Sequence, residues 1–252
     1  MCGIFAINKE TISPIDIIDS LDSISHRGPD NTDYFNTKDY KTYLGHTRLS
    51  IIDLDIRANQ PMVDHSGRFI LVYNGEIYNY QKLKKELDLK YNIPWKTRSD
   101  SEVIIEGFAF EGVAFLEKLN GIFAIVLYDT QTKEMFVLRD PIGVKPIYYT
   151  SQKGTFFCSE IKGLLAIKDL TFSLRFESIA DQLAFMYIPE PNTIYNEIFK
   201  LPAGFLFTFK DGKKINEIRL FKNLDINFAK SKNSLSAGEF DTELSNAIDR
   251  QL

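Results

Sequence analysis

The sequence predicts an α+β protein whose strands pair largely in an antiparallel way. Segments with strand-like composition and segments with helical periodicity fall in separate runs, which is typical of this fold class. Two pairs of predicted strands are each joined by a short turn, across Lys153-Gly154 and Asp211-Gly212. The 252 residues, 44% of them apolar, suffice for one large domain or two small ones.

The N-terminal half is predicted to alternate between strands and helices. Residues 3–7 form an apolar first strand, and Ser13-Pro14 then supplies an N-cap and a first-turn proline for a helix. The remaining elements are expected as extended segments near 42–53 and 68–74, a helix from Tyr80 with Leu83 and Leu87 on its buried side, and a helix over 103–110 behind the capping box Ser99-Asp100-Ser101-Glu102.

The C-terminal half is predicted to be mainly strands. These are expected over residues 120–128, 135–139, 147–150, 155–159, 205–209 and 214–219, with one helix over 177–187. From about residue 222 the chain becomes polar, which predicts a linker. A closing helix follows, capped by Ser236 and Glu239, with Phe240, Leu244 and Ile248 as an apolar stripe.

Composition excludes several classes of function. The 30 basic residues are scattered among 34 acidic ones and the net charge is −4, so a nucleic-acid partner is not expected. The longest apolar run, Ile122 to Tyr128, is far shorter than the ~20 residues that span a bilayer. Two cysteines provide no disulfide framework, and the residues before Cys2 leave no room for a signal peptide. We therefore expect a cytoplasmic protein that does not enter the membrane.

Cys2 is the first candidate for chemistry. If Met1 is removed, Cys2 carries a thiol and a free α-amine, with reference pKa values near ~8.5 and ~8. The amine can then take the thiol proton directly or through one water, which makes one residue both nucleophile and base. The alternative is that a cysteine stands at position 2 without any function.

Asn74-Gly75, at the end of an apolar run, is the second candidate. An Asn-Gly pair after a strand is commonly a turn. It also has the groups of an oxyanion hole, because the Asn74 amide and the Gly75 N–H can both donate to a developing negative oxygen. Glycine would let the backbone approach closely. Both interpretations stay open on these residues alone.

Arg48 and Asp100 are isolated charges beside apolar residues. An arginine can hold a carboxylate by two parallel bonds and an aspartate can hold an ammonium, so the pair could clamp both ends of a free α-amino acid. The alternatives are an arginine at a strand edge and an aspartate at a helix N-terminus.

Other catalytic schemes find less support. The three histidines, His26, His46 and His65, lack the spacing to either cysteine that marks a papain-like enzyme. Cys158 alternates like a strand residue and is expected in the core. We expect no metal site, because no Cys/His cluster is present, and no glycine-rich phosphate loop is found.

The order of these motifs along the chain resembles one family. The matching segments are Met1-Cys2-Gly3-Ile4-Phe5, His26-Arg27-Gly28-Pro29-Asp30, His46-Thr47-Arg48-Leu49-Ser50-Ile51, Asn74-Gly75-Glu76-Ile77-Tyr78-Asn79, Ser99-Asp100-Ser101-Glu102, Gly121-Ile122-Phe123-Ala124 and Arg139-Asp140-Pro141-Ile142-Gly143-Val144-Lys145-Pro146. Together they resemble the N-terminal class II glutamine amidotransferase domain of glutamine-hydrolysing asparagine synthetases. Two departures from the family pattern, Asn31-Thr32-Asp33 and Ala203, carry none of the chemistry and are expected to affect only local loops.

The resemblance implies a four-layer αββα sandwich of the Ntn-hydrolase type, with two antiparallel sheets between helices. It places Cys2 at the start of a strand with an Asn74-Gly75 loop above it. Residues 1–221 would form the amidotransferase domain. Residues 222–252 would be a linker and helix leading toward a synthetase domain that this chain does not contain, so the chain is either a fragment or a stand-alone subunit.

The resemblance also implies a glutaminase site. Cys2 would attack the side-chain amide of L-glutamine to form a γ-glutamyl thioester, with Asn74 and Gly75 as the oxyanion hole. Arg48 would bind the α-carboxylate, and Asp100 and Glu76 the α-ammonium. The backbone of Leu49, Ser50, Ile51 and Ile52 would line the same pocket.

No cofactor is expected in this chain, since ATP and Mg²⁺ would belong to the synthetase domain or subunit that receives the ammonia. L-Glutamine and that synthetase are the expected partners, and a homodimer stays open. Aspartate is the default ammonia acceptor. The alternatives are a different amidation partner, or a non-catalytic domain that senses glutamine or serves as a scaffold.

Overall fold

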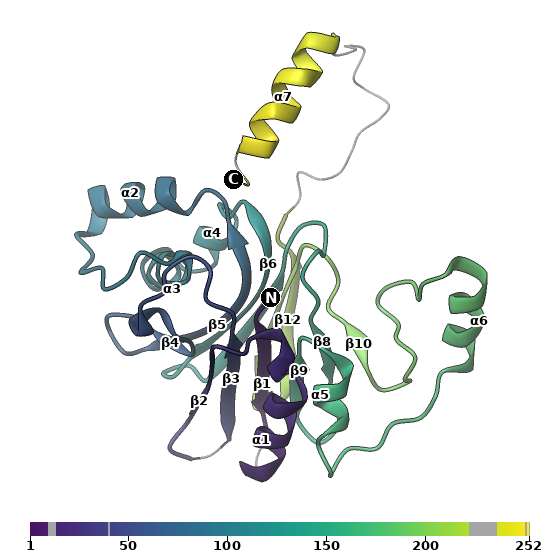
Figure 1. The fold of residues 1–252 in the computed structure, drawn as a ribbon. Coiled ribbons are helices and arrows are strands. Elements are labelled where there is room, and N and C mark those ends of the chain that lie inside the picture. The colour runs from purple at the N-terminus through teal and green to yellow at the C-terminus, as the bar shows by residue number, and fades with distance from the viewer. Residues whose placement is uncertain (10–13, 40, 222–235, 250, 252) are drawn as a thin grey trace.

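Two six-stranded sheets form the centre of the molecule (Figure 1). The computed structural model describes all residues except 10–13, 40, 222–235, 250 and 252. The first sheet has the order β10-β8-β9-β1-β3-β2 and the second the order β12-β11-β7-β6-β5-β4. The paired strands within each sheet run antiparallel.

The strands of the first sheet are β1 (Gly3–Asn8), β2 (Asn31–Asn36), β3 (Thr42–Arg48), β8 (Tyr148–Thr150), β9 (Thr155–Cys158) and β10 (Phe199–Lys200). Those of the second are β4 (Met62–Val63), β5 (Phe69–Ile77), β6 (Gly121–Asp129), β7 (Glu134–Arg139), β11 (Phe205–Lys210) and β12 (Lys213–Arg219). The helices are α1 (Pro14–Ser23), α2 (Tyr80–Tyr91), α3 (Asp100–Glu111), α4 (Val113–Leu116), α5 (Ile161–Leu165), α6 (Phe176–Phe185) and α7 (Ala237–Asp249), with 3₁₀ turns η1 (Ser25–Arg27) and η2 (Ile56–Ala58).

Three apolar layers separate four layers of secondary structure. One layer lies between the two sheets and contains Ile4 and Leu44 from the first and Ile70 and Val72 from the second. A second layer packs α2, α3 and α4 onto the outer face of the second sheet, and a third packs α1 and α5 onto the outer face of the first. The predicted sandwich of two antiparallel sheets between helices is therefore confirmed.

Alternation along the strands decides which side chains enter the space between the sheets, because successive residues of a strand point to opposite faces. On β1 and β3, Ile4 and Leu44 face inward while Phe5 and Tyr43 face α1. On β5, Ile70 and Val72 face inward while Leu71 and Tyr73 face α3. The inner face therefore extends to His46 and Arg48 on the first sheet, and to Asn74 and Glu76 on the second.

Most predicted elements are present, and the differences have local causes. The extended segment expected over 42–53 ends at Arg48, because the next residues form a loop. Strand β2 was not predicted, since its sequence Asn-Thr-Asp-Tyr-Phe-Asn is polar and lies at a sheet edge. Helix α5 was also missed, because its five residues are too few for a periodic pattern.

The C-terminal helix forms with the predicted capping box. Ser236 Oγ accepts the Glu239 amide at 3.3 Å, and Glu239 Oε2 accepts the Ser236 amide at 2.8 Å. The stripe of Phe240, Leu244 and Ile248 is exposed. The predicted linker over 222–235 and the Ser13 N-cap lie outside the described residues.

Candidate active site

Cys2 lies directly before β1 and is held by a buried arginine. Arg27 Nε donates to the Cys2 carbonyl at 3.0 Å, and Arg27 Nη1 donates to Glu160 Oε1 at 2.8 Å. Close packing here depends on glycine, because a Cβ at Gly3 would lie 2.4 Å from Thr47 Oγ1. The local sequence therefore fixes the Cys2 backbone against β3.

The Cys2 thiol points toward the loop after β3. Its Sγ lies 3.4 Å from the Leu49 amide and 3.7 Å from the Leu49 carbonyl oxygen. Burial raises the pKa of the thiol, and the Leu49 amide, the N-terminal charge and Arg48 offset part of this rise. The thiol at neutral pH therefore needs a base to become a nucleophile.

A pocket of about 140 Å³ brings the predicted residues together. Eight of its lining residues were predicted with Cys2: Arg48, Leu49, Ile51, Ile52, Asn74, Gly75, Glu76 and Asp100. Ser50 is not among the lining residues of the described part of the chain, and its amide donates to Asp30 Oδ2 at 2.7 Å. Four segments far apart in the sequence thus meet at one pocket.

Asn74 and Gly75 lie within strand β5, so the expected loop above Cys2 is wrong. Gly75 pairs with Phe123 of β6, and a Cβ at Gly75 would lie 2.2 Å from the Ile122 carbonyl oxygen. Glycine is required here because the neighbouring strand is close. The paired strand holds both residues more rigidly than a loop would.

The two donors of this strand nevertheless face the pocket. Asn74 Nδ2 is buried and has no hydrogen-bond partner among the described residues. Along the strand, the amides of Tyr73 and Ile77 donate away from β6, to Gln60 Oε1 at 2.6 Å and Asp100 Oδ2 at 3.1 Å. Because backbone amides alternate in direction, the Gly75 amide between them points to the same side.

Asp100 opens helix α3, behind the Ser99 N-cap, and is buried. Its Oδ2 accepts the Tyr73 hydroxyl at 2.7 Å as well as the Ile77 amide. Burial raises the pKa of its carboxyl, the hydrogen bonds from Tyr73, Ile77 and Ser101 lower it in part, and Glu76 raises it further. An arriving ammonium would favour the carboxylate form.

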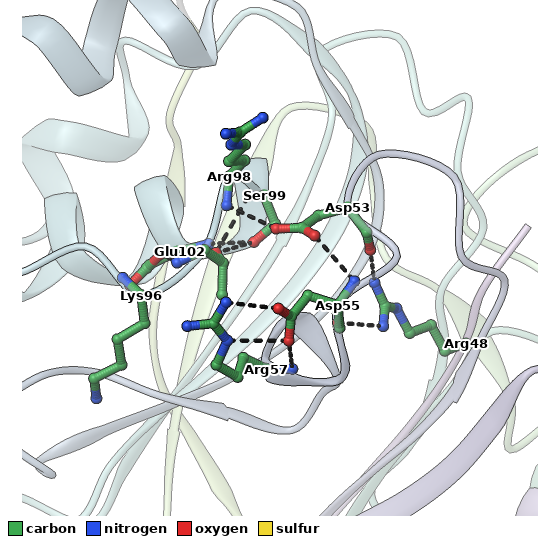
Figure 2. Close-up of polar contacts among 9 residues, drawn as sticks. Arg48, Asp53, Asp55, Arg57, Lys96, Arg98, Ser99 and Glu102 are labelled. Atoms are coloured by element: carbon green, nitrogen blue, oxygen red, sulfur yellow. Dashed lines mark hydrogen bonds and ion pairs between the residues drawn. The ribbon is translucent and has the colours of Figure 1, made fainter.

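Arg48 lines the pocket but also holds the loop that follows it (Figure 2). Its Nη1 donates to Asn59 Oδ1 and to the Asp55 carbonyl oxygen, at 3.2 Å for the latter, and its Nη2 donates to the Asp53 carbonyl oxygen. Asp53 Oδ2 in turn accepts the Arg98 amide at 2.7 Å, next to Ser99. Among the described residues, these contacts do not use Nε or the second hydrogen of Nη2, which could therefore donate to a ligand.

Several residues of the site were not predicted, because only long-range contacts reveal them. The Tyr73 hydroxyl donates to the Asp100 carboxylate. The Gln60 side chain accepts a backbone amide of β5. Asp140 accepts the amides of Phe123, Ile142, Val144 and Lys145, and so shapes the loop that brings Lys145 to the pocket. The motif around Asp140 was visible in the sequence, but its partners were not.

The competing schemes fit the structure poorly. The three histidines bond to other groups: His26 to Glu160, His46 to the Tyr73 carbonyl and His65 to Glu106. Cys158 is buried, and burial raises the pKa of its thiol to about 12. Asp64, His65 and Glu106 do come close enough to suit a metal ion, which the sequence did not predict. Hydrogen bonds within this cluster and its turn already engage all three side chains.

Comparisons with known proteins show which family and which fold this chain shares. A family model described as a glutamine amidotransferase domain matches residues 1–219. A putative glutamine-hydrolysing asparagine synthetase of Methanocaldococcus jannaschii is 38% identical over 225 residues, covering 81% of this chain and 43% of that protein. The glutamine-hydrolysing asparagine synthetase 1 of Bacillus subtilis is 32% identical over 229 residues, covering 88% of this chain and 35% of that protein. The chain thus spans less than half the length of these relatives.

Solved structures share the fold. The glutamine phosphoribosylpyrophosphate amidotransferase of B. subtilis matches with a TM-score of 0.64 and 19% identity over 88% of this chain and 50% of that one. A regulatory enzyme of purine biosynthesis matches with a TM-score of 0.67, also at 19% identity. Among the described residues, no helix is long and apolar enough to cross a membrane.

Proposed function

The chain belongs to the glutamine amidotransferase family, and on that premise we propose that it hydrolyses L-glutamine to L-glutamate and ammonia through Cys2. The observation that carries the proposal is the meeting of Cys2, the two donors of Asn74-Gly75, Arg48 and Asp100 at one pocket. A thiol nucleophile, an oxyanion hole and a clamp for both charges of an α-amino acid are the parts that glutamine hydrolysis needs.

In the proposed reaction, the Cys2 sulfur attacks the side-chain amide carbon while the thiol proton passes to a base. The carbonyl oxygen becomes an oxyanion that accepts hydrogen bonds from Asn74 Nδ2 and the Gly75 amide. The C–N bond then breaks, and the proton goes to the leaving ammonia. Water adds to the resulting γ-glutamyl thioester through a second oxyanion, which releases glutamate and the free thiol.

The base is proposed to be the α-amine that Cys2 gains once Met1 is removed. Burial raises the pKa of the thiol, and no histidine of the chain bonds to it, so it needs a nearby proton acceptor. An N-terminal amine meets this need because its pKa is close to that of the thiol. Met1 itself lines the pocket, so its removal also enlarges the space beside Cys2.

The ammonia is proposed to serve an ATP-dependent amidation of the asparagine-synthetase type, with aspartate as the default acceptor. Support comes from the relatives named as glutamine-hydrolysing asparagine synthetases, whose N-terminal part resembles this chain. ATP and Mg²⁺ would bind to that synthetase domain or subunit. A different amidation partner remains compatible with the same glutaminase site.

The purified chain is expected to release ammonia and glutamate from L-glutamine in equal amounts, without ATP or aspartate. The residues that line the pocket lie within residues 1–101, apart from Lys145. A coupled assay for glutamate, run with and without ATP, Mg²⁺ and aspartate, measures this. Glutamine binding without turnover would instead favour the non-catalytic sensor. An ATP-dependent amide product would contradict the assignment of ATP-dependent amidation to a separate synthetase domain or subunit.

Arg48→Met is expected to raise the KM for glutamine by about 10- to 100-fold, with a smaller effect on kcat. A hydrogen bond to a charged group contributes about 1.5–3 kcal/mol, and the α-carboxylate keeps its charge along the reaction. Steady-state kinetics with Arg57→Met provide a control, because Arg57 pairs with Asp55 on the same loop outside the pocket.

The Asn59→Ala change distinguishes the role of Arg48 in holding the loop from its proposed role in binding the α-carboxylate. This change removes one loop contact of the guanidinium but keeps its charge. An equal rise in KM for Asn59→Ala would mean that Arg48 acts through the loop and not on the carboxylate.

A further inference from the structure

His46 forms a hydrogen bond between the two sheets at the site. Its ring is fully buried, and Nε2 lies 3.1 Å from the Tyr73 carbonyl oxygen. Because a carbonyl oxygen only accepts, Nε2 must carry the proton. Nδ1 is buried and has no hydrogen-bond partner among the described residues, which suits a neutral ring.

The strand register places His46 on the same face as Cys2, diagonally across from it on the neighbouring strand. His46 pairs with Ile4, and Gly3 pairs with Thr47, so continuation of the register sets Cys2 opposite Arg48. Side chains two residues apart share a face, so Cys2, His46 and Arg48 all point toward the second sheet. His46 is the member of this row that reaches the strand of the oxyanion donors.

The bond falls at a sensitive point of that strand. The Tyr73 carbonyl and the backbone N–H of Asn74 belong to the same peptide group. A hydrogen bond to this oxygen therefore restrains the orientation of that peptide plane, and with it the backbone position of Asn74. Two other side chains restrain the same segment from the α3 side by three hydrogen bonds: Gln60 accepts the Tyr73 amide, and Asp100 accepts the Tyr73 hydroxyl and the Ile77 amide. His46 is the restraint from the side of Cys2.

The ring keeps one charge state at neutral pH. The pKa of His46 is lowered to about 4, chiefly by burial and in part by the Arg48 cation, while the hydrogen bond to the Tyr73 carbonyl opposes this shift. The ring is therefore a constant donor above that value. Neither proton transfer to Cys2 nor a pH switch is required of it.

We propose that His46 is a positioning residue for glutamine hydrolysis, whose Nε2–H holds the Tyr73–Asn74 peptide so that Asn74 Nδ2 and the Gly75 amide stay directed at the oxyanion above Cys2. This rests on the proposed function and adds a role outside the pocket, which His46 does not line. Preorganised donors lose effect when their orientation relaxes, so the loss of this bond weakens the transition state more than the ground state.

The test compares His46→Leu, which fills similar space without a donor, with His46→Gln, whose amide can donate at a similar reach. Three quantities are measured for each full chain: kcat and KM for glutamine, and the Kd of L-glutamate γ-semialdehyde. The Cys2 sulfur can add to the carbonyl carbon of this aldehyde: a C–S bond replaces the π bond of C=O and gives a tetrahedral hemithioacetal whose oxygen lies where the oxyanion would form. The Kd of L-glutamate, which forms no such adduct, is measured beside it.

We expect His46→Leu to lower kcat by about 10- to 100-fold, which is less than the ~10²- to 10³-fold loss on removal of an oxyanion donor itself, because the donors remain but are less well directed. The aldehyde should bind more weakly by a similar factor, while KM and the glutamate Kd change less than about twofold, because ground-state contacts remain. His46→Gln should restore most of both losses. Ile4→Val, which trims the paired residue in the same apolar layer, should leave all four values unchanged.

Unchanged kcat and aldehyde affinity in a folded His46→Leu chain would overturn the proposal, as would equal losses in aldehyde and glutamate affinity, which indicate a merely structural role. If His46→Leu does not fold, His46→Asn takes its place, because its shorter amide does not reach Tyr73. A wild-type chain that neither hydrolyses glutamine nor binds the aldehyde would refute the proposed function itself.

Discussion

The Cys2→Ala chain is expected to bind L-glutamine but to lose its hydrolysis completely. The thiol provides the sulfur of the proposed thioester, so its removal eliminates the covalent route. Arg48 and Asp100 remain to hold the two charges of the substrate, so the ground-state affinity changes little. Calorimetric titration with glutamine and a glutamate assay measure the two effects separately.

Cys158→Ala is the matched control for this experiment. Cys158 lies in the core between β9 and α5 and is fully buried, so it should tolerate loss of its sulfur with activity intact. An electrophilic glutamine analogue should label Cys2 but not Cys158. Labelling of Cys158, or residual turnover in Cys2→Ala, would contradict the assignment of the nucleophile.

The same labelled sample tests the base. Its intact mass should correspond to a chain without Met1, because the proposed α-amine exists only after that residue is removed. A chain that retains Met1 and hydrolyses glutamine at the full rate would mean that another group accepts the thiol proton.

Asn74→Ala is expected to lower kcat by about 10²- to 10³-fold, which is the usual effect of removing one oxyanion donor. KM should change much less, because the ground-state carbonyl oxygen gains less from this donor than the oxyanion does. The Gly75 amide is part of the backbone and stays in place, so the loss is partial. The kcat from steady-state kinetics and the affinity for the aldehyde should both decrease, by similar factors.

The control for this prediction is Asn79→Ala. Asn79 lies five residues further along, and its amide bonds the backbone of Lys118 and Asn120 outside the pocket. Its loss should reduce stability slightly and leave kcat nearly unchanged. If Asn74→Ala affects KM alone, the oxyanion assignment is wrong and Asn74 is a ground-state ligand.

Arg48 has two roles in this structure, one in holding a loop and one in lining the pocket. The guanidinium faces the pocket, yet three of its contacts go to the loop after β3 (Figure 2). A substrate carboxylate would therefore meet an arginine whose position is already fixed, which lowers the entropic cost of binding. The loop and the clamp are thus one unit, and changes in the loop are expected to affect glutamine affinity.

Local patterns in the sequence were sufficient for much of the fold. The strand at 3–7, the helix behind Ser99 and the hairpin at Asp211-Gly212 each depend on neighbouring residues, and all three are present. The order of the motifs was also sufficient to identify the family, because each motif keeps its residue types and its place along the chain.

The errors have a common origin in contacts that local patterns do not contain. Asn-Gly has the composition of a turn, but Asn74 and Gly75 pair with Ala124 and Phe123, some fifty residues away, and stay in a strand. Polar β2 forms only because β3 provides its partner. In both cases tertiary pairing overrides the local preference.

The sequence by itself determined which groups are the candidates for the proposed chemistry: a thiol at position 2, an amide and a glycine at 74 and 75, and opposite charges at 48 and 100. Only the tertiary structure decided that these groups face one another, and that Tyr73 and His46 hold them. Residue type and periodicity act within a few positions along the chain. The approach of Cys2 to Asn74 depends on the register of two sheets and on the packing between them, which no short segment specifies.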